Sequence, residues 1–308
     1  MSNYIGRFAP SPSGPLHLGS LTCALASYFD AKANHGRWLV RIEDIDPPRE
    51  QVGADKLILS TLHAHGLYAD GEVRYQSTRS RAYEAALETL RRRSLSYRCS
   101  CTRKQLGQHA NQTLNKTSAT NDSLCNCHKQ PPASDSASAV RLHVPSGISS
   151  GMTRKVVFND AIHGPTDEDI AAGGDFIVRR KDDFFAYQLA VSVDDIDQEI
   201  SHVVRGSDLL ETTAKQIWLI HLLGGTAPKY AHIPVICTEP GRKLSKQNHA
   251  EAICNDSASI NIRAACRALG LSDPPRTENI ETLLKWGIQR WSLAAIRGKR
   301  EVMLDSLI

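Results

Sequence analysis

Hydrophobic and polar positions near the start of the chain predict a strand, a helix and a second strand. The apolar run at residues 4–9 is typical of a buried strand. From residue 20 onward apolar side chains recur at helical spacing, and residues 37–42 form a second apolar run. A strand–helix–strand unit of this length favours two parallel strands, so we expect the start of a Rossmann-like sheet in an α/β protein.

The same two periodicities continue along the rest of the chain. Amphipathic helices are predicted at residues 52–66, 78–93, 260–269 and 280–297. Strands are predicted at residues 140–144, 155–159, 199–205 and 232–237, the last of which would be the final core strand. Residues 176–195 predict a hairpin that turns at 181–183 and returns into a strand or the start of a helix. A helix after residues 199–205, with Ser207 or Asp208 as its N-cap, gives a second strand–loop–helix unit.

The loop between the first strand and the first helix carries candidate chemistry for binding phosphate. His17, Gly19 and Ser20 stand where the helix is expected to begin. A helix N-terminus offers free backbone N–H groups and the positive end of the helix dipole. Gly14 and Gly19 allow the backbone to approach a ligand closely, and His17 can donate a hydrogen bond to a phosphate oxygen. Alone, a short motif of this kind is also compatible with a simple turn.

Charged residues follow two of the predicted strands. Glu43, Asp44 and Asp46 come after residues 37–42, and Arg205 ends the strand at 199–205. Ligands of Rossmann-like sheets bind outside the carboxyl ends of the strands. The planar guanidinium of Arg205 suits a carboxylate, whereas a solvated acidic turn and a surface salt bridge are the alternative interpretations.

A basic loop, Lys243-Leu244-Ser245-Lys246, follows the last predicted core strand. Lysines on such a loop can stabilise negative charge that develops on a leaving group. A basic surface loop is the alternative interpretation.

Two closely spaced cysteine pairs, Cys99/Cys101 and Cys125/Cys127, flank the polar stretch at 108–123. Four thiolates can surround a tetrahedral metal ion, and zinc fits such soft ligands best. The C-x-C spacing is tighter than the usual C-x2-4-C, and unliganded reduced cysteines are the alternative. Because the polar stretch cannot form a core of its own, we expect one structural zinc ion per chain.

Composition narrows the class of protein without deciding its function. The chain has 308 residues, a formal net charge of +4 and a pI of about 8.6, which is compatible with RNA binding. We find no run of 18 apolar residues and no apolar signal region at the N-terminus. We therefore expect a cytoplasmic protein, taken as a monomer, without a membrane span. Its eight cysteines should be reduced or metal-bound.

Residues 7–20 (RFAPSPSGPLHLGS) resemble the first signature of class I aminoacyl-tRNA synthetases, in its glutamyl and glutaminyl variant. Ser20 replaces the last histidine of that signature. The segments RIEDID, FAYQLAVSVDD and VVRGSDLL also resemble the family, and KLSK resembles its second signature, with Leu244 in place of methionine and Gln247 in place of the final serine. The resemblance covers about residues 4–250 and implies a Rossmann-like catalytic domain with a zinc-bearing insertion and a small C-terminal helical region.

The resemblance also implies roles for particular residues. It places ATP at His17, Gly19, Ser20 and Lys246, and it makes His17, Lys243 and Lys246 catalytic. It places glutamate at Arg7, Ala9, Ser11, Glu43, Tyr187 and Arg205, with Glu43 on the amino group. Some bacterial members bind zinc through a C-x-C pair, a tyrosine and a cysteine. Ser123 would take the tyrosine's place, so the third ligand could be Cys125, Ser123 or His128.

The implied domains are residues 1–95 with 176–246 for catalysis, 96–175 for the insertion and 247–308 for the C-terminal helices. After Lys246 we expect only a small helical cap and no anticodon-binding domain. That matches a shortened branch of the family, which activates glutamate with ATP and Mg²⁺ and transfers it to queuosine, the wobble base of tRNA(Asp).

Two other functions stay open at this stage. The first is a glutamyl-tRNA synthetase that charges the tRNA 3′ end. The second is an inactive, zinc-containing RNA-binding descendant of a synthetase, against which the intact Lys243–Lys246 loop argues.

Overall fold

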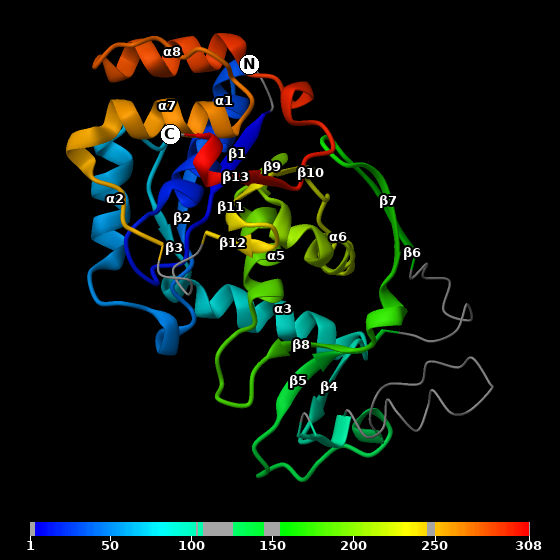
Figure 1. The fold of residues 1–308 in the computed structure, drawn as a ribbon. Helices are drawn as coiled ribbons and strands as arrows, with labels where there is room; N and C mark the ends of the chain where they lie inside the picture. The colour runs from blue at the N-terminus through cyan, green and yellow to red at the C-terminus, as the bar shows by residue number, and fades with distance from the viewer. Residues whose placement is uncertain (1–3, 103, 107–125, 145–154, 245–249, 308) are drawn as a thin grey trace.

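Parallel β-strands with helices packed against them form the centre of the molecule (Figure 1). The computed structural model describes residues 4–102, 104–106, 126–144, 155–244 and 250–307. Strand β1 (Ile5–Phe8) pairs in parallel with β2 (Arg37–Ile42), which pairs in parallel with β3 (Arg74–Tyr75). Parallel neighbours need a crossover, and helix α1 (Leu18–Ala33) provides it between β1 and β2. The predicted βαβ unit is therefore confirmed.

A second group of strands adjoins the first. Strand β9 (His202–Gly206) pairs in parallel with β10 (Lys229–Ile233), β10 with β6 (Lys155–Asp160), and β6 forms an antiparallel hairpin with β7 (Gly164–Asp169). The two groups meet at β1 and β9, where the Ser201 backbone N–H donates to the Ile5 carbonyl at 2.9 Å. Because β1 and β9 start side by side and run the same way, their carboxyl ends open on one common edge.

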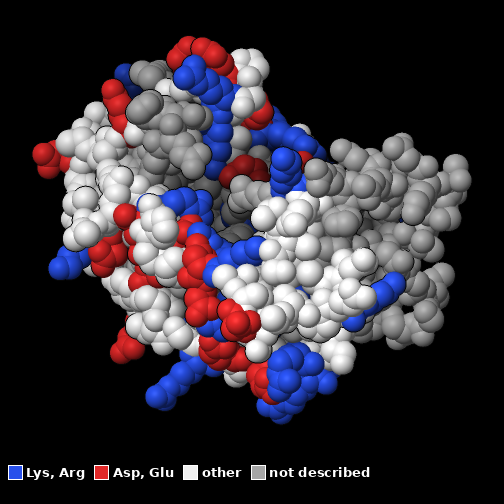
Figure 2. Space-filling view, turned by 90° about the horizontal axis from the view of Figure 1, so that it is seen from below, with Lys and Arg blue, Asp and Glu red and all other residues white. Residues whose placement is uncertain are grey.

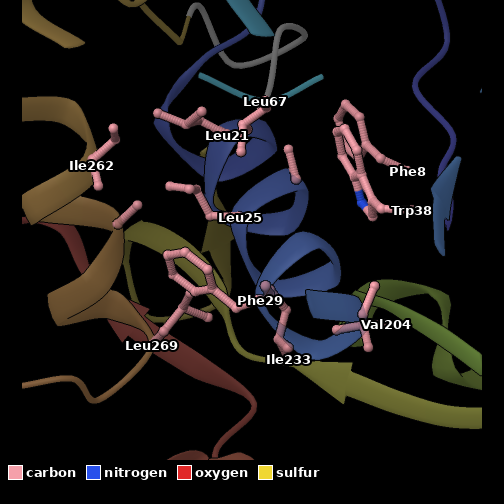
Figure 3. Packing of buried hydrophobic residues seen from close by; sticks show 14 of the residues in the cluster. Phe8, Leu21, Leu25, Phe29, Trp38, Leu67, Val204, Ile233, Ile262 and Leu269 are labelled. Atoms are coloured by element: carbon pink, nitrogen blue, oxygen red, sulfur yellow. The ribbon is translucent and has the colours of Figure 1, made fainter. Parts of the chain in front are cut away.

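Helix α1 is the centre of the first hydrophobic cluster. Its Leu21, Leu25 and Phe29 are fully buried. They pack against the side chains of α7 (Ala258–Ala268) and α8 (Ile280–Arg290), as Figure 3 shows for Ile262 and Leu269. The segment after the basic loop is thus packed into the same core as the first strands.

A second cluster lies beneath the other helices: α3 (Ser80–Arg92), α5 (Tyr187–Asp197) and α6 (Thr213–Leu222). Its largest fully buried member is Tyr83. Helix α2 (Ala54–Ala64) contributes Ile58 and Leu62 to the first cluster instead.

The remaining strands form two small sheets. Strands β4 (Ser96–Cys99), β5 (Ala139–Leu142) and β8 (Phe176–Arg179) pair antiparallel and lie at the end of the molecule far from α7 and α8 (Figure 1). Strand β11 (Val235–Glu239) pairs with β12 (Arg242–Lys243) and with β13 (Glu301–Met303). The short 3-10 turns are Pro47–Arg49, Gln76–Arg79, Asn126–His128, Ile170–Gly173, Ser207–Thr212, Asn255–Ser257, Leu293–Ile296 and Leu304–Ser306.

The structure corrects two predicted elements and decides between two alternatives for a third. The single strand predicted at 232–237 is wrong, because Pro234 separates β10 from β11 and the two belong to different sheets. The helix predicted at 280–297 ends at Arg290, where the indole of Trp291 turns aside to donate to Asp30 at 2.7 Å. The hairpin turn predicted at 181–183 is followed by one bridge, Arg179 to Phe185, and the chain then enters α5, so the helix is the predicted alternative that is confirmed.

Two further findings concern boundaries and length. Ser207 and Asp208 lie in a 3-10 turn, and Thr212 is the N-cap of α6, so the predicted N-cap is wrong. Among the described residues, every helix is too short or too polar to cross a lipid bilayer.

Candidate active site

One cavity of about 570 Å³ opens where β1, β2 and β9 end and α1 begins. Its volume is in the range of about 300–1,000 Å³ that small-ligand sites occupy. The residues predicted for ATP or glutamate that line it are Arg7, Ala9, Ser11, His17, Gly19, Ser20, Glu43, Tyr187 and Arg205, and Lys243 joins them. Residues from both signatures are therefore brought together, while Lys246 falls outside the described residues.

His17 is the N-cap of α1, and the helix begins at Leu18, two residues earlier than predicted. Its Nδ1 accepts a hydrogen bond from the Ser20 backbone N–H, and the Ser20 hydroxyl lies 2.8 Å from the His17 backbone nitrogen. A Cβ on Gly19 would lie 3.1 Å from the imidazole ring, so glycine keeps this turn compact. With Nδ1 as the acceptor, the neutral ring carries its proton on Nε2, where it can donate to a phosphate oxygen.

A buried charge network supports the other end of the cavity. Asp195 accepts from Arg7 Nε at 3.3 Å and from Arg41 Nη2 at 2.8 Å. Burial alone would raise the pKa of Asp195, but the charges of Arg7 and Arg41 outweigh it and hold that pKa below its usual range. Asp195 was not among the predicted site residues. Its sequence signal is its place at the end of the FAYQLAVSVDD segment, beside Asp194, to which no role was assigned.

Glu43 stands beside this network with an incomplete set of partners. Its side chain is buried, Oε1 has no hydrogen-bond partner, and Arg41 Nη2 is 3.6 Å from it. Burial raises the pKa of Glu43 to about 7, against the opposing charges of Arg41 and Arg7. A cavity-lining carboxylate of this kind is well suited to bind a ligand ammonium group.

Arg205 is held by five hydrogen bonds, one for each N–H of its guanidinium. Three are short: Nε to His232 Nε2 at 3.0 Å, and Nη1 and Nη2 to Gln216 and Thr213, each at 2.8 Å. The bonds to Tyr187 Oη at 3.5 Å and to the Leu209 carbonyl at 3.4 Å are long, and both residues line the cavity. A ligand carboxylate would replace these two.

The basic loop approaches the start of α1. The Leu244 carbonyl lies 3.7 Å from the place a Gly19 Cβ would occupy, and Lys243 Nζ is 2.6 Å from Asp208 Oδ2. Nearby Cys23 also lines the cavity, but burial raises the pKa of its thiol to about 12, so it stays protonated. Figure 2 shows Lys and Arg side chains, mixed with Asp and Glu, around a hollow on the face seen from below.

A cluster of cysteines lies in the β4–β5–β8 region. The Sγ atoms of Cys99, Cys101 and Cys127 all lie within 4.8 Å of one another. Three thiolates so placed could hold a soft metal ion such as zinc. Cys125 and Ser123 fall outside the described residues, and the imidazole of His128 stacks on His143 with 3.9 Å between ring centroids.

Comparison with known proteins defines the class. A model of the catalytic domain of class I tRNA synthetases (E and Q) matches residues 5–274. A solved glutamate tRNA ligase from Elizabethkingia meningosepticum is 22% identical and superposes with a TM-score of 0.76 over 99% of this chain and 68% of its own. A glutamate-tRNA synthetase from Elizabethkingia anophelis gives 0.75 at 23% identity, over 97% of this chain and 68% of its own. The predicted synthetase fold is confirmed.

Curated relatives narrow the class further. Proteins named glutamyl-Q tRNA(Asp) synthetase from Vibrio vulnificus strain YJ016 and Thiobacillus denitrificans are each 44% identical, over 97% and 94% of this chain and 93% of each relative. One from Serratia proteamaculans is 42% identical over 98% of this chain and 95% of its own. The chain belongs to this glutamyl-Q tRNA(Asp) synthetase family, and it is a ligase enzyme.

Proposed function

We propose that the chain activates glutamate with ATP and Mg²⁺, forming glutamyl-adenylate and pyrophosphate, and transfers glutamate to the queuosine base of tRNA(Asp). The observation that carries the proposal is that one cavity contains both kinds of binding group. It joins a helix N-terminus suited to phosphate with two arginines and a buried glutamate suited to an amino acid.

The amino-acid end of the cavity has complementary groups for glutamate. Glu43 would accept hydrogen bonds from the substrate ammonium group. Arg7 and Arg205 would bind its two carboxylates, and Tyr187 would stand beside Arg205. Ala9 and Ser11 line the cavity just after β1 and would bound the substrate on that side.

The nucleotide end would hold ATP over the start of α1. His17 Nε2 and the first backbone N–H groups, at Gly19 and Ser20, are donors for phosphate oxygens. A carboxylate oxygen of glutamate would attack the α-phosphorus in line, and the bond from that phosphorus to pyrophosphate would break. Lys243 and Lys246 would stabilise the charge on the departing pyrophosphate, which Mg²⁺ bound to ATP also partly neutralises.

The acceptor, the metal ion and the domain bounds are also part of the proposal. The acceptor, queuosine in tRNA(Asp), is proposed from the names of relatives whose whole length this chain nearly spans. The cysteine cluster of the insertion at 96–175 is proposed to bind one structural zinc ion through Cys99, Cys101, Cys127 and Cys125. The catalytic unit is proposed as 1–95 with 176–246, followed by the C-terminal region 247–308.

The decisive experiment measures transfer of labelled glutamate to four forms of tRNA(Asp). They carry or lack queuosine, and they end in either a normal or a 2′,3′-dideoxy adenosine. We expect labelling of both queuosine-containing forms and of neither form that lacks it.

Labelling that requires the free 3′ end and ignores queuosine would identify a 3′-charging synthetase instead. An ATP–pyrophosphate exchange that does not depend on glutamate would overturn the activation step itself. The Arg205→Ala variant is the control for the cavity, because it removes a predicted carboxylate ligand and should abolish labelling of both queuosine-containing forms.

A further inference from the structure

A buried chain of three side chains runs from the insertion into the cavity. Asp160, at the end of β6, lies with Oδ2 2.6 Å from Nδ1 of His232 on β10. On the other side of the ring, Nε2 of His232 lies 3.0 Å from Nε of Arg205 on β9. The side chains of Asp160 and His232 are fully buried, and Arg205 is 5% exposed.

The hydrogen bonds decide where the proton of His232 lies. The guanidinium Nε of Arg205 can only donate, so Nε2 of His232 must be its acceptor and carry no proton. The neutral ring then has its proton on Nδ1, which donates to Asp160 Oδ2. The other oxygen of Asp160 accepts from the backbone N–H groups of Ile162 and His163, each at 3.0 Å. The backbone N–H of His232 donates to the same oxygen at 3.4 Å, so Asp160 is held in place independently of the His232 side chain.

We propose that Asp160 is a positioning residue for the amino-acid substrate, which it serves by fixing the tautomer of His232 and thereby the orientation of Arg205. The proposal rests on the proposed function, because it takes Arg205 to be a glutamate ligand. It assigns a role in substrate recognition to strand β6, which lies within the proposed insertion at 96–175 and pairs with β10.

The bond from Arg205 Nε to His232 matters because of the shape of the guanidinium group. The guanidinium is planar, so its orientation is set by the bonds to His232, Gln216 and Thr213 on the side away from the cavity. The two long bonds face the residues that line the cavity, and these are the N–H groups a carboxylate would take. Losing the Nε bond would let the plane rotate and would misplace both of them.

The surroundings of His232 favour the neutral ring. Asp160 faces it from β6, Arg205 from β9, Thr213 from α6 and His163 from the β6–β7 turn, while Tyr230 stacks on it from its own strand. Burial lowers the pKa of His232, although the hydrogen bond to Asp160 opposes that shift, and the charge of Arg205 lowers it further. If Nε2 of His232 were protonated at acid pH, its N–H would face the Nε–H of Arg205, and the hydrogen bond between them would be lost.

The first test is Asp160→Asn. Its oxygen can still accept from the two backbone N–H groups, so its amide nitrogen must face His232 Nδ1 and donate to it. The ring proton then moves to Nε2, against the N–H of Arg205. We expect the KM for glutamate to rise by at least about tenfold in ATP–pyrophosphate exchange, with the KM for ATP within about twofold.

Two substitutions of His232 separate its two bonds. In His232→Gln the side-chain oxygen can reach the place of Nε2 and accept from Arg205, so glutamate affinity should be largely retained. In His232→Asn the amide can still donate to Asp160, but it does not reach Arg205, so affinity should fall as in Asp160→Asn. The matched control is His65→Asn, because His65 is equally buried but bonds to Thr61, outside the cavity lining.

A spectroscopic measurement keeps the proposal testable if Asp160→Asn does not fold. Long-range ¹H–¹⁵N correlation of the wild-type histidines should show His232 protonated on Nδ1 only, assigned by its loss in His232→Gln. A proton on Nε2 would overturn the proposal. So would an unchanged glutamate KM in folded Asp160→Asn, whereas wild-type protein without glutamate-dependent exchange would overturn the proposed function instead.

Discussion

Lys243 Nζ lies 2.6 Å from Asp208 Oδ2 at the edge of the cavity, and the next residue, Leu244, adjoins the first turn of α1. Lys243 thus pairs with the VVRGSDLL segment, while Leu244 brings the same loop next to Gly19 in the first signature segment. Both partners are more than a third exposed, so the ion pair itself contributes little to stability. The ion pair matters because it holds a positive charge at the cavity that His17, the N-cap of α1, also lines.

The first prediction concerns that charge. Lys243→Ala should lower the rate of glutamate-dependent ATP–pyrophosphate exchange by about 10²- to 10³-fold, the usual effect of removing one group that stabilises developing negative charge. The control is Lys285→Ala, because Lys285 forms an equally short ion pair with Glu281 on the exposed face of α8. A loss of the same size in both variants would mean that Lys243 acts only through general stability or charge.

The second prediction is a pH dependence at Glu43. Burial raises its pKa to about 7, so the carboxyl of the free enzyme is protonated below that pH and ionised above it. Since only the ionised form attracts the substrate ammonium group, kcat/KM for glutamate should rise as pH increases through about 7 and then level off. Steady-state exchange at limiting glutamate measures this.

Glu43→Gln provides the control for this rise of kcat/KM with pH. The variant cannot ionise at this position, so the rise of kcat/KM near pH 7 should disappear and kcat/KM should fall by roughly 10- to 100-fold at pH 8.

The same substitution should increase the stability of the fold at pH 8, although it lowers activity there. A carboxyl with a raised pKa in the folded state destabilises the fold once pH exceeds its ordinary value, so Glu43→Gln should melt higher than wild type at pH 8 but not at pH 4. If kcat/KM of the variant still rises near pH 7, the pH dependence belongs to a group other than Glu43.

The first βαβ unit was predictable because its signals are local. The predicted strand at 37–42 matches β2 to the residue, and the bounds of the strand at 4–9 and the start of the first helix were placed within two residues. Apolar periodicity, two glycines and a polar helix start all agree there. That the candidates His17, Glu43 and Arg205 line one cavity follows from the same logic, because parallel strands bring their carboxyl ends to one edge, whereas the role of Arg7 was implied by the family resemblance.

What the sequence did not reveal depends on contacts between distant segments. Asp195 lies on α5, and its partners Arg7 and Arg41 are on β1 and β2, so hydrophobic periodicity does not mark it as part of the charge network. Strand β13 has only three residues and exists because β11 offers it an edge. Pro234 sits within an apolar run whose continuity concealed the break between two sheets. Periodicity reports how a segment is buried, but not which partner buries it.

The third prediction concerns the packing of α8 on α1. A Cβ on Gly287 would lie 2.5 Å from Cζ of the fully buried Phe29. Alanine favours a helix over glycine by about 1 kcal/mol, but overpacking a core costs about 1–3 kcal/mol. We therefore expect Gly287→Ala to lower the free energy of unfolding in urea, and Phe29→Leu to restore part of it in the double variant. Ile260→Ala, at an exposed position of α7, should change it by less than about 0.5 kcal/mol.

The last prediction concerns the cysteine cluster. If Cys99, Cys101 and Cys127 hold a metal ion, the purified protein should contain one zinc per chain, and serine at any of the three should release it. Structural zinc contributes on the order of 10 kcal/mol to small thiolate sites, so the zinc-free variants should also melt lower. Cys237→Ser is the matched control, because Cys237 is as buried as Cys99 but lies on β11 in another sheet. The fourth ligand follows from the same assay. Loss of zinc in Cys125→Ser would identify Cys125, whereas retention there with loss in Ser123→Ala or His128→Asn would identify one of those residues instead.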